Sequence, residues 1–124
     1  MNDKMKPKTV IRVTDVVGDS RCIRVEDGQH LYKRIVPLIR QGKHVAVSFD
    51  GVEMMIPPFI SSAFGRLHGE FTKSRIRSKL SLIDISSNYL NVFQRTMEWA
   101  EFYYENPDAC NRIWEEEMGE EVEP

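Results

Sequence analysis

The stretch HVAVSFDGVEMMIPPFISSAFGRLHGEF, residues 44–71, decides the fold. Its first six residues, His44–Phe49, carry no acidic side chain and are mostly apolar, which is typical of a strand buried inside an α/β sheet. Apolar residues then repeat at helical spacing from Phe59 to Leu67, and proline is favoured in a first helical turn, so the stretch predicts a helix over Pro58–Phe71. A strand that leads through a short loop into a helix indicates an α/β protein.

The flanking sequence extends the same alternation. β-Branched residues predict a strand over Thr9–Val17 and a short edge strand over Cys22–Val25. Apolar spacing predicts a helix from Asp27 to Gly42, kinked or cut short at Pro37 because proline lacks a backbone N–H. The remaining expected elements are a basic connector (Thr72–Lys79), a strand (Leu80–Ile85), a long helix capped by Ser86–Asn88 (Tyr89–Glu105) and a short helix (Ala109–Met118). This order predicts a mostly parallel sheet covered by helices.

The length of 124 residues suits one domain, expected over 1–124, with the core over about 8–107 and a short helix and acidic tail over 108–124. No stretch approaches the roughly 20 apolar residues that cross a bilayer, and no apolar segment of a secretory signal follows the N-terminus. Two cysteines form neither a disulfide framework nor a zinc site. We therefore expect a cytoplasmic protein with reduced thiols and no membrane partner.

Charge is unevenly distributed along the chain. The net charge of −2 does not favour nucleic acid as a partner. Residues 1–43 carry ten Lys/Arg against five Asp/Glu, whereas residues 87–124 carry two against ten. Either the two ends attract each other, within the fold or between copies of the chain, or a basic face and an acidic tail contact different partners.

No motif for catalysis or cofactor binding is present in the sequence. Gly42-Lys43 lacks the upstream glycine and the following hydroxyl residue of a phosphate-binding loop. The three histidines have neither the spacing of metal ligands nor a nearby cysteine. We therefore expect no enzyme activity, no cofactor and no metal site. The alternative is an enzyme whose site is assembled in space from His68, Asp50 and Asp84.

Three further features each admit two interpretations. Asp50 follows a predicted central strand, where α/β sheets place functional groups, but Asp50-Gly51 is also favourable turn chemistry. Ser61 and Ser62 fall in the first turns of a helix, where they either accompany a bound phosphate or allow close packing. The basic strip Lys73–Lys79 either meets phosphates or an acidic surface, or it is a solvated connector.

The central stretch resembles the signature of STAS-like proteins, relatives of the anti-sigma factor antagonists. In that family a strand ends in a V-D-F-x-G-V-like segment and leads into a helix with the pattern S-F-x-x-x-x-F-G-x-L. The similar positions here are Val47–Val52 and Phe59–Leu67. The flanks are also similar, with Asp27-Gly28 before a helix and A-x-x-Y-Y-x-N-P at Ala100–Pro107. The most similar branch is the small STAS-like domain family of unassigned function.

The resemblance implies a small mixed sheet of about four strands with helices packed mainly on one face. It also implies a regulatory module whose partner is a protein, kinase-like or otherwise regulatory. In the antagonists, phosphorylation of a Ser or Thr at the start of the helix after the central strand releases the partner. Aligned on Phe49–Val52, that acceptor position falls at about Pro58, after Pro57, and neither residue accepts phosphate.

Two functions follow from these features. The first is a non-catalytic protein–protein interaction module, for which a second copy of the chain is a further candidate partner. The apolar segment Met54–Pro58 either faces that partner or turns inward to complete the core. The alternative is a small-ligand or nucleotide-binding sensor lined by Asp50, Asp84 and the basic strip. The residues expected to bind the partner are Asp50, Met54, Met55, Ile56, Pro57, Pro58, Ser61 and Ser62.

Overall fold

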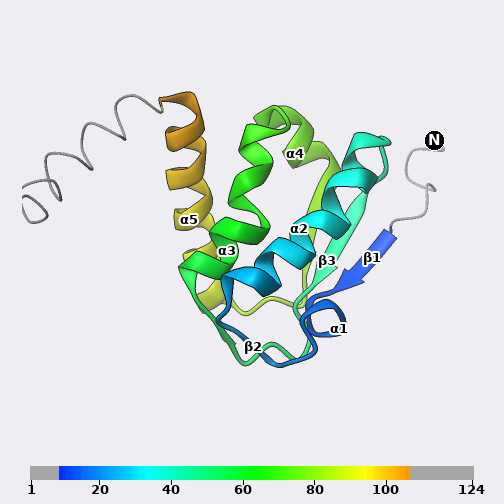
Figure 1. Ribbon diagram of the computed structural model, residues 1–124, viewed down its shortest axis with the longest axis vertical. Coiled ribbons are helices and arrows are strands. Elements are labelled where there is room, and N and C mark those ends of the chain that lie inside the picture. Colours follow the sequence, from blue (N-terminus) through cyan, green and yellow to red (C-terminus); the bar gives the residue numbers. More distant parts are fainter. Residues whose placement is uncertain (1–8, 107–124) are drawn as a thin grey trace, which may run out of the picture.

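The computed structural model describes residues 9–106 (Figure 1). The elements in order are β1 (Thr9–Arg12), α1 (Val13–Val17), β2 (Arg21–Cys22), α2 (Val25–Arg40), β3 (Val45–Ser48), β4 (Met54–Met55), α3 (Pro57–Ala63), the 3-10 helix η2 (Gly65–Gly69), α4 (Lys73–Lys79), β5 (Leu80–Ile83) and α5 (Ser87–Glu105). The helix predicted over Ala109–Met118 lies outside the described residues, so it stays a prediction, as does a single domain over 1–124.

The sheet has three parallel strands in the order β1-β3-β5, with Ile11 opposite Val47 and Val47 opposite Leu82. Strands β2 and β4 form a separate parallel pair. The predicted mixed sheet of about four strands is therefore wrong for the described part of the chain. The reason is α1, which turns the chain at the end of β1, so that the next strand leaves the sheet and pairs with β4 instead.

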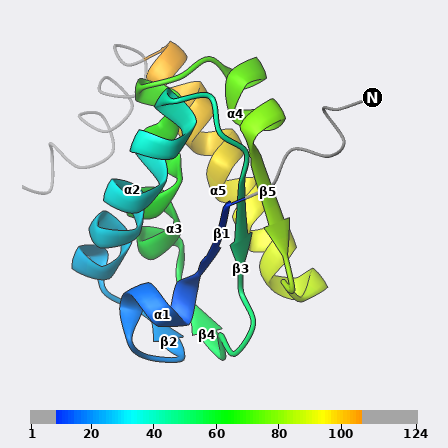
Figure 2. The ribbon, with the colours of Figure 1, turned by 90° about the vertical axis from the view of Figure 1, so that its right-hand side faces the viewer.

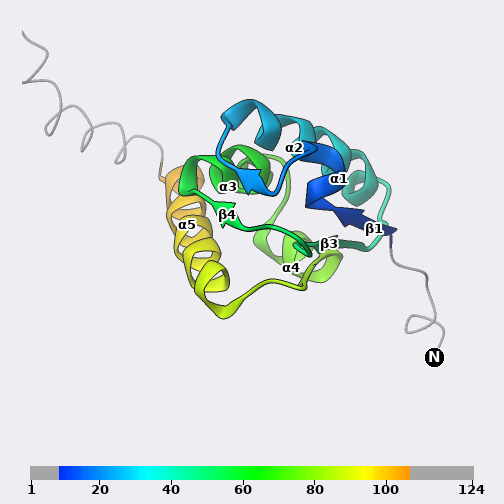
Figure 3. The ribbon, with the colours of Figure 1, turned by 90° about the horizontal axis from the view of Figure 1, so that it is seen from below.

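Helices cover one face of the three-stranded sheet. Ile11, Val45 and Val47 point toward them and are buried. On the opposite face, Val10 is 58% exposed and Ile83 is also exposed. Figure 2 shows β1, β3 and β5 side by side, with α2 and α3 to one side of them and α5 behind them, and Figure 3 shows the same arrangement from below. Any site built from helices must therefore lie on the far side of the molecule from the open sheet.

Two predicted elements have a different conformation. The strand predicted over Thr9–Val17 ends at Arg12, and the helix α1 follows, closed by Gly18 at φ 78°. Burial of Val13 in the core outweighs the β propensity of this segment. The predicted connector Thr72–Lys79 is the helix α4, whose N-cap hydroxyl on Thr72 accepts a hydrogen bond from the Arg75 N–H.

The expected helix over Pro58–Phe71 is divided. Helix α3 ends at Ala63, Phe64 leaves the helical conformation, and the 3-10 helix η2 follows. Helix α2 begins two residues earlier than predicted and continues through Pro37 to Arg40 rather than ending early. The strand β3 and the Ser86 cap of α5 agree with the sequence analysis.

Helices α2 and α3 cross at very short range. A Cβ added to Gly28 would overlap the Ser62 hydroxyl and would lie 2.8 Å from the Phe59 carbonyl oxygen. Only glycine permits this approach. Within residues 9–106, no helix combines the length and the apolar character that crossing a bilayer requires.

The segment after β3 shows which way its methionines point. Met55 pairs with Cys22 of β2 and is 4% exposed, whereas Met54 is 47% exposed. Successive residues of a strand point to opposite sides, so pairing with β2 turns one methionine into the core and the other into solvent. Met55 therefore has the inward orientation, one of the two weighed for this segment, and its predicted contact with a partner stays a prediction.

Met55→Asp should lower the free energy of unfolding by more than about 3 kcal/mol, because it places a charge in an apolar site. Met54→Asp is the matched control, and its effect should stay within about 0.5 kcal/mol. Urea unfolding followed by circular dichroism measures both. Equal effects of the two substitutions would contradict the strand alternation described here.

Candidate functional site

A groove of about 670 Å³ opens to solvent between α2 and α5, with α3 and η2 forming its base. In Figure 1 helix α3 lies between α5 and α2. Ligand sites in proteins occupy about 300–1,000 Å³. The groove is therefore the candidate site on the helical side of the molecule.

Small side chains form the floor of the groove: Ser61, Ser62, Gly65 and Ala100. A Cβ added to Gly65 would lie 3.1 Å from the Ala100 Cβ, so α5 approaches η2 closely. The Ser62 hydroxyl lies 3.0 and 3.1 Å from two backbone carbonyl oxygens, to which it donates, and the residue is 8% exposed. The floor therefore contains no large side chain, and the Ser62 hydroxyl already has hydrogen-bond partners within the protein.

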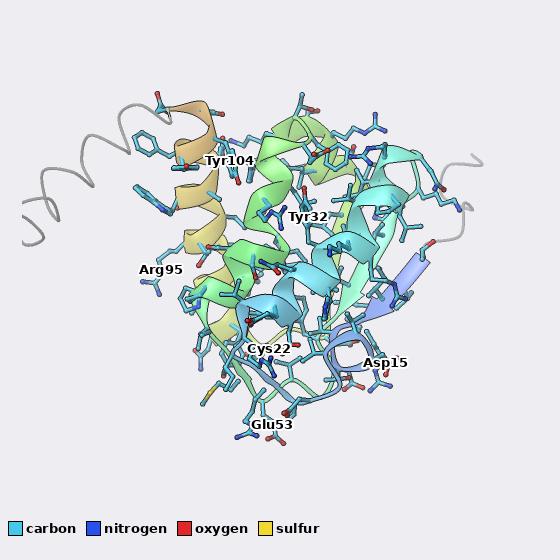
Figure 4. All side chains as sticks on the ribbon, in the orientation of Figure 1. Asp15, Cys22, Tyr32, Glu53, Arg95 and Tyr104 are labelled. Carbon is cyan, nitrogen blue, oxygen red and sulfur yellow. The ribbon has the colours of Figure 1, made fainter. Side chains whose placement is uncertain are left out.

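Aromatic side chains of α5 form one wall. Trp99 is 54% exposed, and its ring centroid lies 5.7 Å from that of Phe102. Tyr103 and Tyr104 meet edge to face with centroids 5.1 Å apart. Figure 4 shows Tyr104 near the upper end of α5; its ring lies over Gly69, where an added Cβ would be 2.8 Å away. Clustered aromatic surface left in water is typical of a binding site.

The wall opposite α5 and one end of the groove contain both apolar and polar side chains. Val25 and Gln29 of α2 line the wall, and Pro58 lies at the start of α3. The guanidinium of Arg66 lies 4.2 Å above the ring centroid of Tyr32, a cation–π contact. Burial raises the pKa of Tyr32. Among the described residues that line the groove, Arg66 alone carries a charge.

The residues predicted to bind a partner are divided by the structure. Pro58 and Ser61 line the groove, and Pro57 is exposed next to them. Ser62 lies in the floor but is buried with its hydroxyl occupied, because it holds α3 against α2. The structure thus shows the close packing that was one of the two interpretations of Ser62, and its predicted role in partner binding stays a prediction. Ile56 is half-buried and packs against the core.

Asp50 lies outside the groove, at the end of β3. Its carboxylate pairs with the Arg12 guanidinium at 2.8 Å, and both side chains are largely exposed. A second cavity of about 150 Å³ is lined by Asp50 and Asp84, and the Ser48 hydroxyl donates to the Asp84 carboxylate at 2.7 Å. This volume is below the range of small-molecule sites, so the cavity does not suit a nucleotide.

The ligand-sensor hypothesis placed the basic strip beside these carboxylates, and the structure separates them. Lys73–Lys79 form α4, which precedes β5, whereas Asp84 follows β5. The two groups therefore lie at opposite ends of the strand. Lys73 is paired with Glu101 of α5 at 2.9 Å, which lowers the pKa of Glu101, and Arg75 donates to a carbonyl at the end of α2 at 2.9 Å.

The catalytic alternative is also not assembled. His68 lies in η2 beside a cavity that neither Asp50 nor Asp84 lines, and burial lowers its pKa. His44 and Ser81 are in contact at 2.6 Å, but neither lines this cavity, the groove or the cavity at Asp84. No group of three or more His, Cys, Asp or Glu side chains within residues 9–106 could hold a metal ion.

Sequence reasoning missed the aromatic wall. It included the residues of this wall only in the predicted helix Tyr89–Glu105 and in the pattern at Ala100–Pro107, and it assigned them no functional role. The available signal was density, since residues 99–104 hold four aromatic side chains. A surface helix buries only one face. Because these aromatic residues surround the helix over about one and a half turns, some of their side chains must be exposed.

One of three comparisons with known proteins gave a match. The model of a family described as STAS-like domain of unknown function (DUF4325) matches residues 27–90, just over half of the chain. No curated protein and no solved structure matched. The matched part runs from α2 to the first turn of α5 and contains the groove floor except Ala100.

The two neighbouring serines of α3 should respond differently to a negative charge. Ser62→Asp should lower the free energy of unfolding by more than about 2 kcal/mol, because it buries a charge at the α2–α3 contact. Ser61→Asp, half-buried in the open groove, should lower it by less than about 1 kcal/mol. Denaturant unfolding of both variants tests this prediction. A larger loss of stability for Ser61→Asp than for Ser62→Asp would contradict the burial of Ser62 in the groove floor.

Proposed function

The chain belongs to the family of STAS-like domains of unknown function, and we propose that it is a non-catalytic regulatory module that binds a protein partner in the groove between α2, α3 and α5. The observation that carries this proposal is the exposed aromatic wall beside a floor of small residues. A floor without large side chains permits the backbone of a partner to approach closely, and the aromatic rings supply apolar contact area. Interfaces draw most of their affinity from such aromatic anchors.

The partner segment that fits best is an amphipathic helix. Helix α3 (Pro57–Ala63) is about 9 Å long at about 1.5 Å per residue, and the floor continues past it to Arg66 of η2, so it offers the length of about two turns of a partner helix. A helix with apolar residues at i, i+3, i+4 and i+7 presents one apolar stripe of that length. Arg66 adds a position for an acidic side chain of the partner.

The chemistry of the lining favours binding over catalysis. The described residues of the groove include serines, tyrosines and one arginine, but no histidine, aspartate, glutamate or lysine. A serine or tyrosine there has no neighbouring general base to activate it. The start of α3 carries Pro57 and Pro58 in place of a hydroxyl residue, so regulation of this module would not use a phosphate at that position.

Selection of peptides from a displayed library against the whole chain tests the proposal. The selected peptides should be amphipathic and helical when bound, and Trp99→Ala should weaken them at least about tenfold, or 1.4 kcal/mol. Ser61→Trp should weaken them as well, because it fills the floor. Isothermal titration calorimetry with each purified variant measures the change.

Val10→Ala is the matched control, because Val10 is apolar and 58% exposed but lies on the open face of the sheet. Its affinity for the peptides should stay within about twofold of wild type. Peptides that lose affinity with Val10→Ala and not with Trp99→Ala would move the binding surface to the sheet and refute the groove.

A further inference from the structure

The groove lies next to the point where the chain leaves the described structure. Helix α5 ends at Glu105, one residue after Tyr104, which lines the groove. The residues that follow therefore emerge at the end of the groove marked by Tyr104 and Arg66, where Figure 1 shows the top of α5. The segment that follows residue 106 therefore begins next to the exposed aromatic wall.

The sequence of that segment complements the groove in polarity. If Ala109–Met118 is helical, as its pattern predicts, then Cys110, Ile113, Trp114 and Met118 lie along one side of it. Residues 107–124 carry one arginine and seven acidic side chains, a net charge of −6. The lining of the groove carries only the positive charge of Arg66 among its described residues. Apolar contact and charge therefore both favour binding of this segment in the groove.

The lengths also agree. Trp99 lies six residues before the end of α5, about 9 Å along the helix axis. A chain that reverses at Asn106–Asp108 and continues as a helix from Ala109 reaches Trp114 after about 7.5 Å. Trp114 would then be level with Trp99 and Ala100, where the small residues Gly65 and Ser61 lie beside Ala100.

We infer that the chain's own segment Ala109–Met118 docks in the groove and competes there with the protein partner. This inference rests on the proposed function of the groove and adds its regulation: the partner helix must displace the segment before it binds. The apparent affinity for the partner is then reduced by the fraction of molecules in which the segment occupies the groove. Substitutions in the segment tune binding without contact with the partner.

Thiol cross-linking in the full-length chain tests the docking without any partner. Cys110 is a native reporter in the segment, while Cys22 is buried, and burial raises the pKa of its thiol to about 11, so Cys22 reacts slowly. In the Ser61→Cys variant, a short bis-maleimide should join positions 61 and 110 within one molecule. Intact mass and tryptic mapping identify the product.

Glu98→Cys is the control, because Glu98 lies at the same height on α5 but on the side away from the groove. The Ser61→Cys variant should cross-link at least tenfold faster than the Glu98→Cys variant, and Gln29→Cys, on the other wall, should behave like Ser61→Cys if the latter folds poorly. Similar rates at the groove and at the control would refute docking. Cross-linked dimers would also refute it, because they assign the groove to a second copy.

Peptide binding separates this inference from the proposed function. Trp114→Asp should raise the affinity of groove-selected peptides severalfold, since it removes the competing segment. Peptides that bind wild type and Trp114→Asp equally, together with no preferred cross-link, would overturn the inference and leave the proposed function in place. A preferred cross-link in a chain that selects no peptide would overturn the proposed function and retain the docked segment.

Discussion

The crossing of α2 over α3 is the contact on which the rest of the structure depends. Gly28 faces Ser62 and the Phe59 carbonyl at a distance that excludes even one methyl group. The Ser62 hydroxyl then donates across the crossing, so this buried polar group is satisfied. Because the two helices meet this closely, both can lie on the same face of a sheet that is only three strands wide.

Small side chains at the helix contacts also create the groove. Gly65 lets α5 approach η2 until Ala100 is in contact, and large residues at either position would push α5 away. Three helices held together by small residues leave a shallow floor, and the long aromatic side chains of α5 stand above it as a wall. The groove is therefore a consequence of close helix packing, and its walls and floor have different chemistry for that reason.

The family match and the structure describe different parts of this site. The matched residues 27–90 contain α2, β3, α3 and η2, which build the helix crossing and most of the floor. The aromatic residues of α5 that line the groove, Trp99, Tyr103 and Tyr104, lie beyond the match. The family match thus covers most of the floor, whereas the aromatic wall that we propose selects a partner comes from the C-terminal half of α5.

The sequence by itself determined those elements whose signals are local. The apolar run of β3, the Ser86 cap of α5 and the spacing of α2 all lead to the observed elements, because hydrogen bonds and burial within a few residues decide them. The absence of a hydroxyl residue at the start of α3 is equally plain in the sequence. Tertiary structure decided what depends on distant partners. Met55 points into the core because β4 pairs with β2. Val13 begins helix α1 instead of continuing the strand, because its side chain is buried in the core. The groove combines residues from position 25 to position 104, and no local pattern brings residues so far apart in the chain to one surface.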